Sequence, residues 1–122
     1  MNTQEIGKAG EDYAAFWLSF TQLQILERNW RFGRNEIDII AKDGMRLVFI
    51  EVKSRSSEKF DFPEDAVNRA KQTAILKVAV NYCNKVEHEG PVRFDIISVL
   101  FSHSGKKLIH TKDAFYPMGD TY

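Results

Sequence analysis

The chain has 122 residues, 43% of them hydrophobic and 28% charged, which is the composition of an ordinary soluble globular protein. This length supports one hydrophobic core, so we expect a single domain over residues 1–122. The formal net charge is zero, which gives no support to a strongly basic nucleic-acid-binding protein. No apolar stretch approaches membrane-spanning length and the amino terminus lacks the features of a signal peptide, so we expect a cytoplasmic protein without membrane association. The single cysteine, Cys83, agrees with a reducing compartment and indicates a packing role.

The first predicted element is an amphipathic helix over about residues 3–20. Apolar residues recur there every three or four positions, and Asn2 with Glu5 resembles a capping box. Gly10 lies inside this helix, where glycine costs about 1 kcal/mol relative to alanine, so we expect another element to approach the backbone closely at Gly10. On this pattern alone, the neighbouring Glu11 is a solvated helix residue.

Three strands are predicted next, over residues 24–31, 36–41 and 46–53. The segment Lys42-Asp43-Gly44-Met45 joins the second strand to the third, and it predicts a hairpin turn with Asp43-Gly44 at its centre. A polar stretch over residues 54–62 is predicted to be a mobile loop above the site described below.

The hairpin brings two acidic residues together. With Lys42 opposite Met45, Glu36 faces Glu51 and Asp38 lies diagonal to Glu51, whereas a slip of one residue on each strand makes Asp38 and Glu51 direct partners. Because side chains alternate with a period of two, Lys53 shares their face of the sheet in either register. The apolar residues of the third strand that alternate with them, Val48, Ile50 and Val52, are predicted to point to the other face of the sheet.

The remaining pattern predicts a second helix beginning at Pro63, with Glu64 and Asp65 in its first turn and an apolar stripe to Tyr82. A strand over residues 92–101, a turn and a short strand over residues 108–111 complete the chain. This order of elements fits a mixed sheet flanked by helices, in which the helical crossover makes the fourth strand parallel to its neighbour.

Asp38 and Glu51 are the candidate metal ligands. They stand 13 residues apart, each within an apolar strand, and the fold gains nothing from clustered acids on a sheet face. Such carboxylates repel one another unless a proton or a cation neutralises them, and hard oxygen ligands suit Mg²⁺ or Mn²⁺. An acid-x-Lys triplet is common by chance, so the prediction rests on the second acid at hairpin-matched distance. Glu36 opens its strand and is better explained as a solvated edge residue.

The candidate nucleic-acid contacts are basic residues near this site. Arg28, Arg31 and Arg34 flank two aromatic residues, Trp30 and Phe32, on and after the first strand. A second basic group, which follows the third strand, comprises Lys53, Arg55 and Lys59. Either a locally basic surface or scattered solvated side chains explains this pattern. The histidines, His88, His103 and His110, indicate solvated or packing roles rather than metal ligation.

Several segments together resemble one bacterial family. The chain is similar, in order and spacing, to the uncharacterised YraN-like proteins over nearly its whole length. The matching segments are Gly7-Lys-Ala-Gly-Glu11, Asn35-Glu-Ile-Asp38, Val48-Phe-Ile-Glu-Val-Lys-Ser-Arg55, Pro63-Glu-Asp-Ala-Val67, Arg93-Phe-Asp95, Ile109-His110 and Asp113-Ala-Phe115. That family is similar in its core to the PD-(D/E)XK nucleases, especially Holliday-junction resolvases.

This resemblance implies an α/β restriction-endonuclease-like core with a mixed sheet in the order α-β-β-β-α-β-β. It also implies that Glu11 is the helix-borne acid of the site, that Asp38 and Glu51 bind metal, and that Lys53 is the motif lysine. The Val52 carbonyl is a candidate further metal ligand, and Lys71 a candidate nucleic-acid contact. Asn35 and Asp61 stand where the family usually has glycine, and Ala74 stands where an arginine is common.

The leading hypothesis is a divalent-metal-dependent endonuclease-like protein that acts on branched or otherwise structured DNA. Lys53 would either orient the attacking water or neutralise developing negative charge. The alternative is a nucleic-acid-binding protein of the same fold with little or no catalytic activity. A structural interaction module leaves the clustered charges unexplained, and a homodimer is left open.

Overall fold

The computed structural model describes residues 1–56 and 67–117. Its elements are α1 (Thr3–Leu18), β1 (Gln24–Phe32), β2 (Asn35–Asp43), β3 (Arg46–Ser56), α2 (Arg69–Lys85), β4 (Val92–Ser102) and β5 (Gly105–Thr111). This order confirms the predicted mixed α/β topology.

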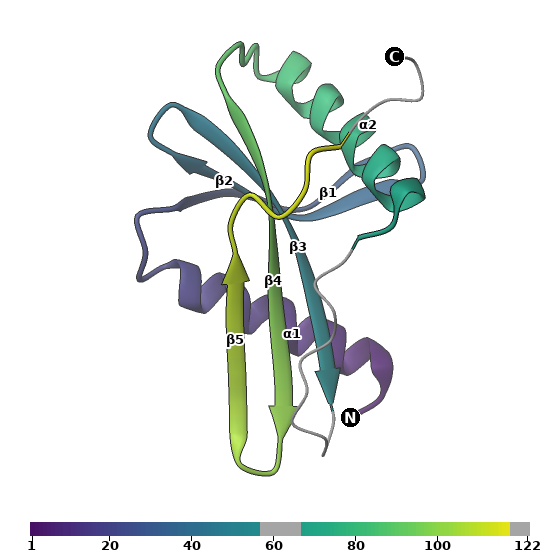
Figure 1. The fold of residues 1–122 in the computed structure, drawn as a ribbon, viewed down its shortest axis with the longest axis vertical. Coiled ribbons are helices and arrows are strands. Elements are labelled where there is room, and N and C mark those ends of the chain that lie inside the picture. Colours follow the sequence, from purple (N-terminus) through teal and green to yellow (C-terminus); the bar gives the residue numbers. More distant parts are fainter. Residues whose placement is uncertain (57–66, 118–122) are drawn as a thin grey trace.

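The strands form one five-stranded sheet in the order β1-β2-β3-β4-β5. Neighbouring strands are antiparallel except β3 and β4, which are parallel and connected through α2, as the predicted helical crossover requires. Figure 1 shows α1 crossing behind β4 and β5, while α2 lies toward the opposite end of the view.

Each face of the sheet carries its own hydrophobic core. Phe49 packs with Tyr82 and other α2 residues on one face, whereas Val48 and Ile50 pack with Leu18 of α1 on the other. The predicted alternation along β3 is therefore confirmed. Within the described part of the chain, neither helix is long and apolar enough to cross a membrane.

The start of α1 and its contact with the sheet follow from the sequence. Asn2 and Glu5 form the predicted capping box, with the Asn2 side chain accepting from the Glu5 N–H at 2.8 Å. A Cβ atom built on Gly10 would collide with the Ser54 side chain of β3. The close approach expected at Gly10 is therefore present, and it fixes α1 against the strand that carries Glu51.

The hairpin between β2 and β3 differs from the register expected first. Asp43 pairs with Arg46, so Gly44 and Met45 form the turn, and Gly44 has a φ of +62°. Asp43-Gly44 is not the centre of the turn because Asp43 continues the strand and the flexible glycine takes the first turn position. The pairing is the register of the one-residue slip, so Asp38 and Glu51 stand one position beyond the last described pair, Ile39 with Ile50.

Two predicted boundaries around the segment after β3 are wrong. Strand β3 continues to Ser56, because pairing with β4 extends to Phe101, so residues 54–56 are not loop. Helix α2 begins at Arg69 rather than Pro63, because the Asn68 side chain caps it by accepting from the Lys71 N–H. Val67 precedes the helix and packs against the α2-side core. The rest of the predicted loop, with Lys59 and Asp61, and the segment 63–66 lie outside the described residues.

Candidate metal centre

Asp38 and Glu51 lie where β2 and β3 separate. The described pairing between these strands ends at Ile39 and Ile50, so the next residues outward, Asp38 and Glu51, stand opposite each other. The Asp38 carboxylate accepts a hydrogen bond from the Val52 N–H, with 2.8 Å between N and Oδ2. A side chain thus takes the place of the strand partner, and the carboxylate lies in the gap between the two strands.

The alternation of faces changes phase at this level of the sheet. Ile37 packs in the α2-side core, yet Ile39, two residues further along β2, packs in the α1-side core. On β1, Arg28 bonds to Asp12 of α1, whereas the Trp30 Nε1–H donates to a side chain of α2. Strict period-two alternation holds along β3 but fails across the middle of β1 and β2.

Burial and mutual repulsion favour the neutral forms of both acids. Burial, followed by the charge of Glu51, raises the pKa of Asp38 to about 8. Burial also raises the pKa of Glu51, which is 8% exposed; the charge and hydrogen bond of Lys71 oppose this rise, and the nearby Glu11 charge adds to it. The pair is therefore under electrostatic strain at neutral pH, which a bound proton or cation relieves.

The donor set fits a divalent cation. Lys71 Nζ lies 3.5 Å from Glu51 Oε2, so one oxygen of this carboxylate already faces a positive charge. The other, Oε1, is buried and has no hydrogen-bond donor among the described residues. A buried carboxylate oxygen of this kind is costly unless a cation or water meets it, and two adjacent carboxylates are hard ligands suited to Mg²⁺ or Mn²⁺.

Glu11 reaches the site from α1. Its Oε1 accepts from the Asn29 side-chain amide at 2.8 Å, and the same nitrogen lies 2.9 Å from Glu36 Oε1. The charge of Glu11 raises the pKa of both Asp38 and Glu51, so all three acids share one electrostatic environment. Within residues 1–56 and 67–117, no group of three or more His, Cys, Asp or Glu side chains is arranged to hold a metal ion.

Lys53 lies two residues beyond Glu51 on β3, where it pairs in register with Ser98 of β4. It is half-buried, and its charge opposes the rise in the pKa of Glu51. Lys53 therefore shares the electrostatic environment of Glu51.

The structure gives partners to most of the predicted nucleic-acid contacts that it describes. Arg28 is paired with Asp12 at 2.8 Å, Arg31 with Glu36 at 2.8 Å, and Lys71 with Glu51 at 3.5 Å. Arg34, in the turn after β1, and Arg55, near the end of β3, are exposed. Acidic neighbours therefore offset much of the basic charge around the site.

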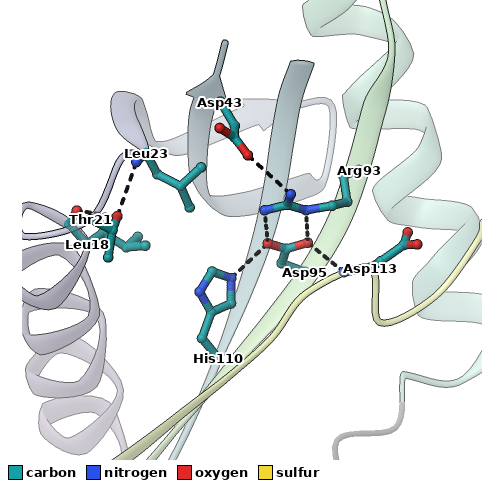
Figure 2. Close-up of polar contacts among 8 residues, drawn as sticks. All are labelled: Leu18, Thr21, Leu23, Asp43, Arg93, Asp95, His110 and Asp113. Carbon is teal, nitrogen blue, oxygen red and sulfur yellow. Dashed lines mark hydrogen bonds and ion pairs between the residues drawn. The ribbon is translucent and has the colours of Figure 1, made fainter. Parts of the chain in front are cut away.

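A second buried polar cluster lies on the α1 face of β4. Figure 2 shows the Asp95 carboxylate accepting from the Arg93 guanidinium, from His110 Nε2 at 2.7 Å and from the Asp113 N–H at 2.9 Å. Arg93 also reaches Asp43 at the end of β2. Burial opposes ionisation of Asp95, but the bonds from His110, Arg93 and the Asp113 N–H hold its pKa below the usual range. This charged cluster ties β5 and the segment after it to the sheet.

The patterns in the sequence did not single out two of these features. The strand pattern over residues 24–31 predicts Asn29 to be an ordinary strand residue, although asparagine is one of the few residues that tolerate positive φ. The ion pair of Lys71 with Glu51 joins residues far apart in the chain, and no local pattern marks it. For the buried cluster, the signal was Arg93-Phe-Asp95 at the start of an apolar strand, where both charged residues share a face.

Fold and site together define a mixed α/β protein with a carboxylate pair between two diverging strands of its sheet. Helix α1 carries an acid, Glu11, and strand β3 carries a lysine, Lys53, near that pair. The chain belongs to the Uncharacterised protein family UPF0102, whose profile matches residues 10–99. The resemblance to the YraN-like proteins is thereby confirmed.

Relatives match nearly end to end. A UPF0102 protein of Thermodesulfovibrio yellowstonii is 46% identical over 112 residues, covering 92% of this chain and 96% of the relative. A UPF0102 protein of Dictyoglomus thermophilum is 47% identical over 109 residues, covering 88% of this chain and 92% of the relative. Among solved structures, Pyrococcus furiosus SfsA in complex with Ca²⁺ aligns with a TM-score of 0.39 and 12% identity. That alignment covers 91% of this chain and 64% of SfsA, so the chain spans less than two thirds of that protein.

Proposed function

We propose that this protein is a divalent-metal-dependent endonuclease that hydrolyses phosphodiester bonds, with branched or otherwise structured DNA as its substrate. The observation that carries the proposal is the buried pair of Asp38 and Glu51. Both lie where the pairing of β2 and β3 ends, burial raises the pKa of both, and the charge of Glu51 adds to the rise at Asp38, while Glu51 Oε1 has no donor within the described chain. Such a pair suits a cation better than it suits the stability of the fold.

The residues would divide the chemistry among them. Asp38 and Glu51 would hold Mg²⁺ or Mn²⁺, with the Val52 carbonyl as a further ligand, and Glu11 would hold the cation or a water beside it. A cation bound there would supply Lewis acidity for the attack of water on the phosphodiester. Lys53 would orient that water or stabilise the negative charge that develops on the phosphate.

A nucleic-acid-binding protein of the same fold without turnover is the second candidate. The ion pair between Lys71 and Glu51 favours this candidate, because the lysine side chain already neutralises part of the negative charge of the site. In that case the acids would need no metal, and the exposed Arg34 and Arg55 would contact phosphates. Lys59, which lies outside the described residues, belongs to the same predicted surface.

Cleavage assays separate the two candidates. Labelled four-way junction, duplex and single-stranded DNA and RNA are incubated with the protein in Mg²⁺, Mn²⁺ or EDTA. The nuclease hypothesis predicts cleavage in Mg²⁺ or Mn²⁺, no cleavage in EDTA, and complete loss of cleavage in Asp38→Asn. If the wild-type protein binds a substrate tightly but cuts none of the panel in either metal, the nuclease hypothesis is wrong and the nucleic-acid-binding protein remains.

The lysine adds a second discrimination. Lys53→Met should abolish turnover while affinity measured in Ca²⁺ stays within a few fold, because one cation among several contacts contributes little to ground-state binding. Lys42→Met, an exposed lysine near the far end of β2, is the matched control and should leave turnover unchanged. A Lys53→Met variant that loses affinity and turnover in equal measure would contradict the assigned role.

A further inference from the structure

Asn29 occupies an unusual backbone position in the middle of β1. Its φ is +53°, in the left-handed region that residues other than glycine, asparagine and aspartate rarely adopt. Arg28 pairs with Ile39 and Trp30 pairs with Ile37, so Asn29 stands opposite Asp38 across the β1–β2 ladder. No register shift occurs at this point, since the irregularity in β1 lies earlier, between Ile25 and Glu27. The left-handed residue therefore serves something other than a bulge.

The side chain of Asn29 meets two acids from different elements. Its Nδ2 lies 2.8 Å from Glu11 Oε1 on α1 and 2.9 Å from Glu36 Oε1 on β2. An amide nitrogen carries two protons, so one Asn29 side chain can donate to both carboxylates at once. Because the amide is neutral, it fixes the carboxylates in place without cancelling their charge. The cation of Arg31, by contrast, offsets the charge of Glu36 at its other oxygen.

We propose that Asn29 is a positioning residue that holds the Glu11 carboxylate beside the Asp38–Glu51 pair. The inference rests on the proposed metal site and deepens it. The left-handed backbone turns the amide toward α1 and β2 at the level where both strands change phase, and asparagine combines that backbone preference with a donor. Glycine would adopt the same φ but would leave Glu11 without its hydrogen bond.

The test measures Mn²⁺ affinity by calorimetry in the absence of nucleic acid, for Asn29→Gly, Glu11→Gln and the double variant. Loss of a residue that orients a metal-site carboxylate weakens metal binding by about tenfold or more. We therefore expect Asn29→Gly and Glu11→Gln to weaken Mn²⁺ binding about tenfold each, and the double variant to bind no more weakly than either. Asn35→Gly, on the same hairpin, is the control and should bind Mn²⁺ as the wild type does.

A purely structural role predicts a different pattern. Asn29→Gly would then lower the thermal midpoint in EDTA, and its effect on Mn²⁺ affinity would add to that of Glu11→Gln. We expect the thermal midpoint to stay close to the wild-type value, because glycine adopts a φ of +53° without strain and the two hydrogen bonds that it removes are exposed. Additive losses, or an Asn29→Gly variant with wild-type Mn²⁺ affinity, would overturn the proposal.

Failure of the metal site itself gives a separate result. If the wild type binds no Mn²⁺, or if Asp38→Asn binds it equally well, then the proposed metal function is wrong. The crystal structure of metal-free Asn29→Gly then decides the inference about Asn29. A Glu11 carboxylate displaced from its wild-type position supports the positioning role, and an unmoved carboxylate overturns it.

Discussion

Replacing Asp38 by asparagine should stabilise the metal-free protein, although it removes a residue of the candidate site. The amide keeps the shape of the carboxyl group and its carbonyl can still accept from the Val52 N–H. What it removes is a charge that burial and Glu51 disfavour. The rise in the pKa of Asp38 from 3.8 to about 8 corresponds to about 6 kcal/mol as an upper limit, at about 1.36 kcal/mol per pH unit.

The expected gain is smaller than this limit, because Asp38 is only partly buried and Lys71 lies nearby. We expect about 2 kcal/mol at pH 8, which raises the thermal midpoint of a chain of this size by roughly 5–10 °C. The folded pKa is raised, so the folded protein binds the proton more tightly than the unfolded chain does. Wild-type stability should therefore be highest near pH 4 with respect to this group, fall as the pH rises toward 8, and level off above it.

The assay is thermal or urea unfolding of both proteins in EDTA, at intervals from pH 4 to pH 9. Asp12→Asn is the control. Hydrogen bonds from Arg28 and Lys8 lower the pKa of Asp12, so this group contributes stability above about pH 4 and loses it only in acid. A midpoint for Asp38→Asn that lies below the wild-type value throughout, in metal-free buffer, would refute the electrostatic account of the site.

Three further substitutions test the fold and the surroundings of the site. Gly10→Ala should destabilise the protein by roughly 2 kcal/mol in urea unfolding, because the added Cβ collides with the Ser54 side chain of β3. Gly7→Ala has open space around it and should stabilise the protein by about 0.5–1 kcal/mol. Equal effects of the two substitutions would contradict the packing of α1. Asp95→Asn should cost roughly 3–5 kcal/mol in the same assay, because the buried Arg93 guanidinium then keeps only its longer contact with Asp43. A loss below about 1 kcal/mol would show that the cluster is dispensable. Lys71→Met should tighten Mn²⁺ binding several fold, because it removes a positive charge that competes with the cation for Glu51. The control Lys77→Met, on the same helix, should leave Mn²⁺ binding unchanged. Weaker Mn²⁺ binding in Lys71→Met would mean that this lysine supports the site.

The sequence predicted the order of elements and the composition of both sheet faces because local periodicity determines them. Alternation along β3 separates Phe49 from Val48 and Ile50, and the apolar stripes of the helices cover these faces. The parallel pairing of β3 with β4 followed from the helical crossover between them. These features depend on residues close together in the chain.

The details of the site depend on contacts that local patterns do not encode. The sequence leaves two hairpin registers open, because either placement of Gly44 in the turn agrees with the hydrophobic pattern. The start of α2 was misplaced because Pro63, Glu64 and Asp65 are typical of a first turn, yet the capping side chain is Asn68. The phase change at Asn29 and Asp38 depends on one backbone angle, which composition does not reveal.

The central claim is that Asp38 and Glu51 share one divalent cation. Crystals soaked in Mn²⁺ and measured at a wavelength where manganese scatters anomalously test it most directly, with Asp38→Asn crystals as the control. The account predicts one anomalous peak in contact with both carboxylates in the wild type and none at that position in the variant. Saturating Mn²⁺ that gives no peak between Asp38 and Glu51, or the same peak in Asp38→Asn crystals, would contradict it.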